Sequence, residues 1–222
     1  MLILPELLLL IALHDEKGTI LSPAATSINY GLAGAVIMEL ALRKKVELRD
    51  KKITVVDDSS TGDSVLDQAL YNMKSQGKSK KPGYWVNKLS GQMTIKDFMT
   101  DRLVEKGIIR VEEHKILWIF DSPRYPMKDP LEEREIREQI RKIVLHGDSA
   151  EPRTAVLIGL VNACRLTNEI FSKEERKEAQ IRIKEIIKKD ILSKAVADTV
   201  AAIEAAVMVA IFSAAAASPT NS

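Results

Sequence analysis

Three stretches of the chain, residues 27–42, 155–166 and 195–213, carry apolar side chains on nearly every side of a helix. A helix that is apolar all round has to be buried all round, so these stretches must share an interior. The segments between them show apolar residues on one side only, at helical spacing. The sequence therefore predicts a mainly α fold, a central helical bundle wrapped by amphipathic helices. No obvious linker divides it, and we expect a single domain over residues 1–222, frayed from about 218.

Both ends of the chain contain apolar runs. Met1–Leu13 lacks the basic start of a signal peptide, so we expect it to form a buried first helix. In residues 195–217, Asp198 and Glu204 interrupt the apolar run. The uninterrupted part after Glu204 is shorter than the roughly 20 residues that a membrane-spanning helix needs. We therefore expect this segment to be the central helix of the bundle.

Strand patterns occur in two places, and each follows a helical pattern. Val46–Arg49 and Ile53–Val56 flank a charged turn, as do Ile108–Val111 and Ile116–Phe120. Alternating segments on either side of a charged turn predict two short β-hairpins. A helix followed by a hairpin thus occurs twice along the chain.

The region between the two hairpins is expected to contain two helices. Thr61-Gly62-Asp63 is a helix start, and the helix that follows should end where the Lys-, Ser- and Gly-rich stretch Ser75–Gly83 predicts a loop. The second helix is expected over about Thr94–Lys106, ending at Gly107.

Charge and cysteine content narrow the classes of function. The chain has 33 Lys and Arg against 31 Asp and Glu, a formal net charge of +2, so anion binding requires a local patch. The one cysteine, Cys164, lies in an apolar run, which indicates a buried, unreactive thiol and a reducing compartment.

Several segments, in order along the chain, resemble the Golgi phosphoprotein 3 family. They are Leu4-Pro5-Glu6-Leu7-Leu8-Leu9, Gly31-Leu32-Ala33-Gly34, Glu39-Leu40-Ala41-Leu42, Thr61-Gly62-Asp63 with Leu66-Asp67 and Ala69-Leu70, Trp85 with Leu89-Ser90-Gly91, Arg102-Leu103-Val104-Glu105-Lys106-Gly107, and Val156-Leu157-Ile158-Gly159-Leu160-Val161-Asn162-Ala163. The resemblance implies a mostly helical domain with a bundle core and no catalytic activity. It also implies a peripheral membrane protein that binds phosphatidylinositol 4-phosphate and, in eukaryotes, holds glycosyltransferase tails.

The chain departs from the family at its lipid pocket, which suits a prokaryotic relative. The family's tryptophan falls near Ser22–Ala24, where no aromatic residue stands, and an arginine of the family becomes Ala33. Of the arginines before the Val156 helix only Arg153 remains. The family's apolar hairpin after that helix is replaced by the charged stretch Phe171–Arg176.

Arg153 is the first candidate for a lipid headgroup site. Pro152 predicts a helix start beside it, and free N–H groups at a helix start favour an anion. Lys142 and His146, at the end of the preceding helix, would add positive charge. In the alternative interpretation Arg153 pairs with Glu151 or faces solvent. If Arg153 binds headgroups, Arg153→Glu should weaken vesicle binding and change the melting temperature little.

A second candidate is the basic run that contains Lys78, Lys80 and Lys81 and precedes Tyr84-Trp85. Such a run suits contact with lipid headgroups or with single-stranded nucleic acid. The alternative is a solvated loop ahead of a core tryptophan.

Two other classes of function stay open. The repeated helix and hairpin resemble a winged helix, but in Thr94–Lys106 three basic residues are offset by three acidic ones, whereas a recognition helix should be basic. Nucleic acid is therefore not the expected partner. The other class is a soluble scaffold that binds a protein through an exposed apolar patch.

No catalytic residue, cofactor or metal ligand is predicted. The chain has no Gly-rich phosphate loop and no nucleophile elbow, and His14-Asp15-Glu16 has no ligand spacing with the other histidines. The expected partners are an anionic phospholipid membrane surface and the cytoplasmic tails of membrane proteins. We expect a cytoplasmic location, peripheral at the membrane, and the sequence leaves the oligomeric state open.

Overall fold

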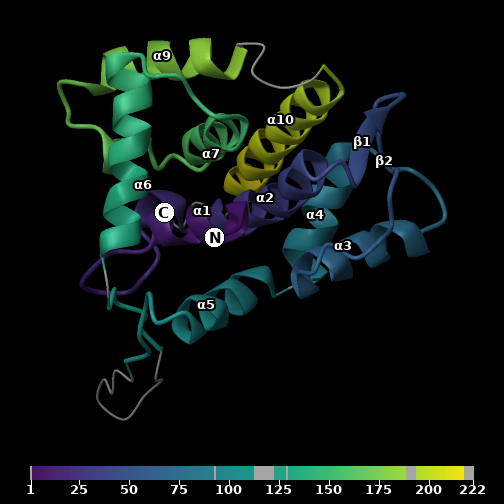
Figure 1. The fold of residues 1–222 in the computed structure, drawn as a ribbon, viewed down its shortest axis with the longest axis horizontal. Helices are drawn as coiled ribbons and strands as arrows, with labels where there is room; N and C mark the ends of the chain where they lie inside the picture. The colour runs from purple at the N-terminus through teal and green to yellow at the C-terminus, as the bar shows by residue number, and fades with distance from the viewer. Residues whose placement is uncertain (1, 93, 113–122, 129, 189–193, 218–222) are drawn as a thin grey trace.

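The computed structural model describes residues 2–92, 94–112, 123–128, 130–188 and 194–217. Its centre is α2, Ile28–Leu42, which contacts α1 (Leu4–Ala12), α7 (Pro152–Ala163), α10 (Lys194–Ala217) and several outer elements (Figure 1). Nearly every side chain of α2 and α7 is buried, as all-round apolar helices require. The predicted mainly α fold is confirmed. The expected fraying from 218 lies outside the described residues.

Outer helices cover this centre on two sides. On one side lie α3 (Ser64–Ser75), α4 (Pro82–Gln92) and α5 (Ile95–Glu105). On the other side lie α6, which continues as the π-helix η2, and α9 (Figure 1). The remaining bounds are η1 Ser22–Ala24, α6 Leu131–Arg141, η2 Lys142–His146, α8 Thr167–Ile170 and α9 Arg176–Lys188.

The first predicted hairpin is confirmed. Strands β1 (Val46–Arg49) and β2 (Lys52–Val55) are antiparallel, with Val46 opposite Val55 and Arg49 opposite Lys52. Asp50 and Lys51 both have positive φ, at 49° and 59°. A two-residue turn with this left-handed backbone matches the twist of the strands that it joins.

The second predicted hairpin has a different pairing in its described part. Ile109 bridges Met127 and Glu112 bridges Arg124, both antiparallel. The strand at 108–111 therefore pairs with residues after the expected return strand, Ile116–Phe120, which lies outside the described residues. A tight turn at Glu112 is excluded because Glu112 itself is paired across to Arg124.

Helix α4 was missed by the sequence analysis. The loop predicted over Ser75–Gly83 ends earlier, because Pro82 begins the helix. Proline lacks a backbone N–H, but N–H groups in the first turn of a helix have no partner within the helix, so no hydrogen bond is lost. Trp85, Val86 and Leu89 are buried on one side of α4. Gly83 and Gly91 lower the helix propensity of the segment, so packing of these three side chains decides the structure.

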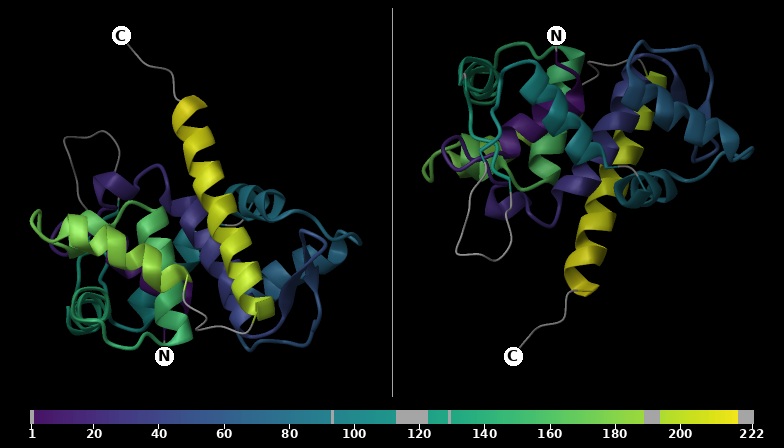
Figure 2. Two further views of the ribbon diagram at one scale, coloured as in Figure 1. Left: turned by 90° about the horizontal axis from the view of Figure 1, so that it is seen from above. Right: turned by 90° about the horizontal axis from the view of Figure 1, so that it is seen from below.

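The prediction that the last helix is buried all round is wrong. In α10 one stripe is buried, formed by Val200, Ile203, Val207, Ala210 and Ile211. On the other side, Val209 is 65% and Phe212 56% exposed. The end of α10 extends beyond the body of the molecule (Figure 2). Among the described residues, Ala197–Ala216 is the one helix that is long and apolar enough to cross a membrane, and 28% of its most apolar window is buried in this fold.

Two glycines let the central helices approach α2 closely. A Cβ atom on Gly31 would lie 2.3 Å from Sγ of Cys164, at the end of α7. A Cβ atom on Gly34 would lie 2.5 Å from a methyl group of Val207 in α10. These distances are too short for any side chain, so the Gly31-Leu32-Ala33-Gly34 segment sets how tightly α2 packs against α7 and α10.

The close packing at Gly31 predicts a rescue. Gly31→Ala should lower the free energy of unfolding by about 1–3 kcal/mol, the usual range for an overpacked core. Cys164→Ala removes the sulfur atom that the new methyl group meets, so the double variant should recover most of that loss. Urea unfolding of the three variants measures both effects.

Gly91→Ala is the matched control, because nothing lies within 4 Å of its added Cβ. It lies in α4 and should leave stability unchanged or slightly raised. Equal destabilisation of Gly31→Ala with and without Cys164→Ala would show that the sulfur contact is not the cause.

Candidate functional site

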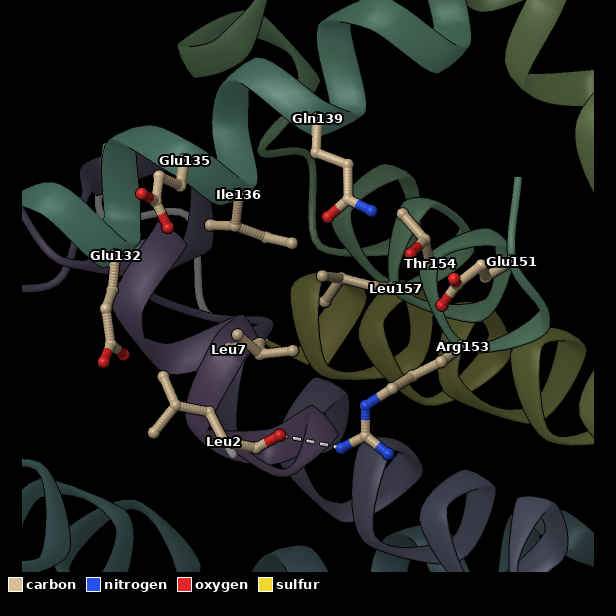
Figure 3. Close-up of a pocket in the computed structure, with 10 residues that line it drawn as sticks. All are labelled: Leu2, Leu7, Glu132, Glu135, Ile136, Gln139, Glu151, Arg153, Thr154 and Leu157. Atoms are coloured by element: carbon tan, nitrogen blue, oxygen red, sulfur yellow. Dashed lines mark hydrogen bonds between the residues drawn. The ribbon is translucent and has the colours of Figure 1, made fainter. Parts of the chain in front are cut away.

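A buried carboxylate accounts for the position of Arg153. Glu39, on α2, is fully buried, and its Oε1 and Oε2 accept from Nη1 and Nη2 of Arg153 at 3.0 and 2.9 Å. Arg43 donates Nε to Oε1 at 2.9 Å, and the backbone N–H of Leu4 donates to Oε2 at 3.0 Å. Arg153 also donates to the carbonyl oxygen of Leu2 at 2.8 Å (Figure 3). Arg153 thus pairs with Glu39, a partner that neither sequence interpretation proposed.

A second buried carboxylate, Glu6, lies in the first turn of α1. Its Oε2 accepts the N–H of Ile3 at 2.8 Å, and its Oε1 lies 2.7 Å from Nζ of Lys106 and 3.1 Å from Nε of Arg102. Arg102 also reaches Asp63, whose other oxygen caps α3. Two of the three basic side chains of Thr94–Lys106, Arg102 in α5 and Lys106 just after it, therefore pair with Glu6, which leaves this segment poorly suited to reading nucleic acid.

A pocket of about 430 Å³ opens beside Arg153, between α1, α6 and α7 (Figure 3). Leu2, Leu7, Ile136 and Leu157 form its apolar walls, and its charged residues are Arg153, Glu132, Glu135 and Glu151. Arg153 is already paired with Glu39, and the three glutamates outnumber this one arginine, so the lining of the pocket is net negative. The negative charge of the three glutamates disfavours binding of a phosphate in this pocket and favours binding of a cation.

The structure does not bring Lys142 and His146 into this pocket. Lys142 is exposed on η2, with its Nζ 3.8 Å from Glu138 Oε1. His146 is exposed at the end of η2. Of the three residues predicted for a headgroup site, only Arg153 lines this pocket.

The lysine-rich loop lies at the surface of the molecule. Lys78 and Lys81 are exposed, and Lys80 places its Nζ 5.4 Å from the ring centre of Tyr84. None of the three forms an ion pair within the described part of the chain. Trp85 is buried, which places it in the core as the alternative interpretation expected.

The hairpin turn adds two lysines that the sequence analysis did not single out. The N–H of Ile53 donates to the carbonyl oxygen of Lys80 at 2.8 Å, so the loop lies against β2. Lys51 and Lys52, at the hairpin turn, are exposed next to it. We call the set Lys51, Lys52, Lys78, Lys80 and Lys81 the basic surface. Asp50, in the same turn, offsets one of its five charges.

Two of the positions at which the chain departs from the resembled family lie in the core of this structure. Ala24 and Ala33 are fully buried. In the charged stretch 171–176, the N–H of Ser172 donates to Glu175, and Glu175 forms two contacts of 2.7 and 2.8 Å with Arg141. The Arg141 guanidinium lowers the pKa of Glu175 to about 2. This stretch is a charged helix start and not an apolar hairpin.

The contacts of Arg153 lead to a different expectation for Arg153→Glu. The change places a second carboxylate against buried Glu39 and should cost on the order of 3–5 kcal/mol, the range for a broken buried ion pair. Lys142→Glu is the control, the same charge reversal at an exposed position, and should stay within about 0.5 kcal/mol. Thermal unfolding of both variants measures this difference, and equal melting temperatures would contradict the role of the Glu39 pair.

Comparison with known proteins identifies relatives along most of the chain. A family model described as Golgi phosphoprotein 3 (GPP34) matches residues 4–203. Vacuolar protein sorting-associated protein 74 of Eremothecium gossypii is 31% identical over 166 residues, 65% of this chain and 49% of that protein. The Schizosaccharomyces pombe protein of the same name is also 31% identical over 166 residues, 65% of this chain and 47% of that protein.

The chain spans about half the length of these curated relatives. The segments that carry the family resemblance build the centre of the fold, from the first turn of α1 to the close packing at Gly31 and Gly34. Since the family model covers residues 4–203 of 222, this chain belongs to the Golgi phosphoprotein 3 (GPP34) family.

Proposed function

We propose that this chain is a non-enzymatic peripheral protein that binds anionic phospholipid headgroups at the cytoplasmic face of a membrane. The observation that carries the proposal is the basic surface, four exposed lysines and the half-buried Lys80, gathered by the contact between β2 and the loop after α3. Family membership makes a membrane surface the expected partner. The near-neutral net charge means that a patch, and not the whole molecule, has to supply the attraction.

The strength of this attraction follows from its charge. Each lysine near an anionic membrane surface contributes about 1 kcal/mol, so five lysines and one aspartate contribute roughly 4 kcal/mol. A binding free energy of that size corresponds to a dissociation constant of about 1 mM. The basic surface alone therefore gives weak attachment that salt readily reverses.

Selectivity for phosphatidylinositol 4-phosphate has less support from the geometry. Ala33 stands in the buried core, and Arg153 is paired with Glu39 in a pocket of acidic sign. We therefore propose binding that follows the charge density of the membrane. Arg153, Lys142 and His146 stay the candidates for any headgroup selectivity that is measured.

The acidic pocket supports a second function, the binding of cytoplasmic tails of membrane proteins. Its three glutamates and apolar walls suit a short peptide with a basic residue beside an apolar one. Cytoplasmic segments near a membrane span are rich in Lys and Arg. Both functions would place the chain at the membrane surface.

Vesicle co-flotation at near-physiological salt tests the lipid proposal. The vesicles are neutral phosphatidylcholine, phosphatidylcholine with phosphatidylserine, and phosphatidylcholine with phosphatidylinositol 4-phosphate at matched surface charge. We expect binding to both anionic vesicles and none to neutral ones. The triple variant Lys78→Glu, Lys80→Glu, Lys81→Glu should bind at least tenfold more weakly, because each change reverses one attractive charge.

The control variant makes the same change in net charge at another place on the surface. Lys173→Glu, Lys177→Glu, Lys184→Glu alters exposed lysines before and within α9 and should bind within about threefold of the unmodified chain. Equal loss in both triple variants would show that net charge, and not the basic surface, drives binding. Selective binding to the phosphoinositide that survives the loop variant would move the site to Arg153, Lys142 and His146.

A further inference from the structure

We propose that the C-terminal half of α10 inserts into the interfacial layer of an anionic bilayer, beside the basic surface. This inference rests on the proposed function and adds the apolar element that weak electrostatic attachment requires. The inserting surface is the α10 apolar face, which we define as Ala205, Val209, Phe212 and Ala216. These residues recur at intervals of four, three and four positions, so they lie on one side of the helix.

The α10 apolar face is exposed in the structure. Val209 and Phe212 are among the largest exposed apolar side chains of the described residues. No charged residue stands between Ala205 and Ala217. The last turns of α10 project beyond the neighbouring helices (Figure 2), so a flat surface can reach them. An apolar helical face bordered by cations is the composition of helices that lie in a membrane interface.

Positive charge lies on both sides of the α10 apolar face. On one side, a groove of about 410 Å³ separates α10 from the hairpin and α4, and Lys51 is the charged residue among those that line it. Pro82 and Gly83 also line this groove, directly after Lys81 of the basic surface. On the other side, the Arg165 guanidinium lies 5.8 Å from the ring centre of Phe212.

This arrangement favours an anionic bilayer over a second copy of the chain. In a bilayer, lysine and arginine side chains meet phosphates at the level where apolar side chains enter the acyl region. A second copy docked by the same face would bring its own cations toward these cations, which opposes association. The buried stripe of α10 stays packed on α2 and α4, so the helix lies in the interface and does not cross the membrane.

A fluorescent probe at Val209 tests the insertion directly. Cys164 is fully buried, and burial raises the pKa of its thiol to about 12, so a thiol-reactive probe modifies an introduced cysteine. The environment-sensitive dye NBD is attached to Val209→Cys and, as control, to Ile181→Cys on α9, which is 55% exposed. With phosphatidylserine-containing vesicles we expect a blue shift and a several-fold intensity gain at position 209 and no change at position 181.

A second experiment measures the apolar contribution to binding. Val209→Ser with Phe212→Ser should weaken co-flotation at least tenfold and leave the remaining binding more sensitive to salt. The matched control is Tyr71→Ser with Phe98→Ser, two exposed aromatic residues on α3 and α5. This control should bind as the unmodified chain does, and both double variants should melt within a few degrees of it.

Each outcome decides between the proposals. If the chain binds vesicles but the NBD emission at position 209 keeps the wavelength it has in water, the inference is overturned and the proposed function stays intact. Absence of vesicle binding overturns both. A blue shift without vesicles that grows with protein concentration, together with a dimeric mass by light scattering, assigns the α10 apolar face to a second copy.

Discussion

The structure depends on burying the carboxylate of Glu39 against the start of α1. Moving an ionised carboxylate out of water costs several kcal/mol, and the cost is offset only when charge and hydrogen bonds are both supplied. Here Arg153 supplies both through two parallel bonds, Arg43 adds a third, and the N–H of Leu4 adds a fourth. One side chain of α2 thereby joins α1 and α7. Because Arg153 is paired with Glu39, its guanidinium is not available as a free cation for binding an anion.

The helical centre could be predicted because its signals are local. All-round apolar composition identified α2 and α7, Asp63 marked the start of α3, and the alternation around Asp50 marked the hairpin. The start of α7 at Pro152 was also visible in sequence. The partner of Arg153 was not, because Glu39 lies more than a hundred residues earlier and no local pattern links them. A pair of this kind is created by packing alone.

The predictions that were wrong for α4 and α10 also failed because packing between elements, and not a local pattern, decides the outcome. Helix α4 contains Gly83 and Gly91, so its propensity is low, and burial of Trp85 outweighs it. In α10 the alanine-rich composition is apolar on all sides, yet among the described residues only one stripe is buried, because α2, α4, β1 and α7 pack on one side of the helix. Composition shows that a helix can be buried, whereas neighbouring elements decide which side is buried. That Lys51 and Lys52 lie next to the lysine-rich loop was not predicted for a related reason. The contact of Ile53 with Lys80 joins two segments that are separated in sequence.

The departures from the family pocket and the exposed side of α10 form one consistent picture. Ala33 is enclosed by the core, and the stretch after α8 has become a charged helix start held by Arg141 and Glu175. Neither feature forms a confined cationic pocket or an apolar hairpin among the described residues. In the proposal made above, the surface that meets a membrane is a set of lysines without ion pairs to described residues, next to an apolar helical face. Such a surface has no fixed geometry for one phosphate, so its affinity should depend on how much anionic lipid the membrane holds and little on which headgroup carries the charge.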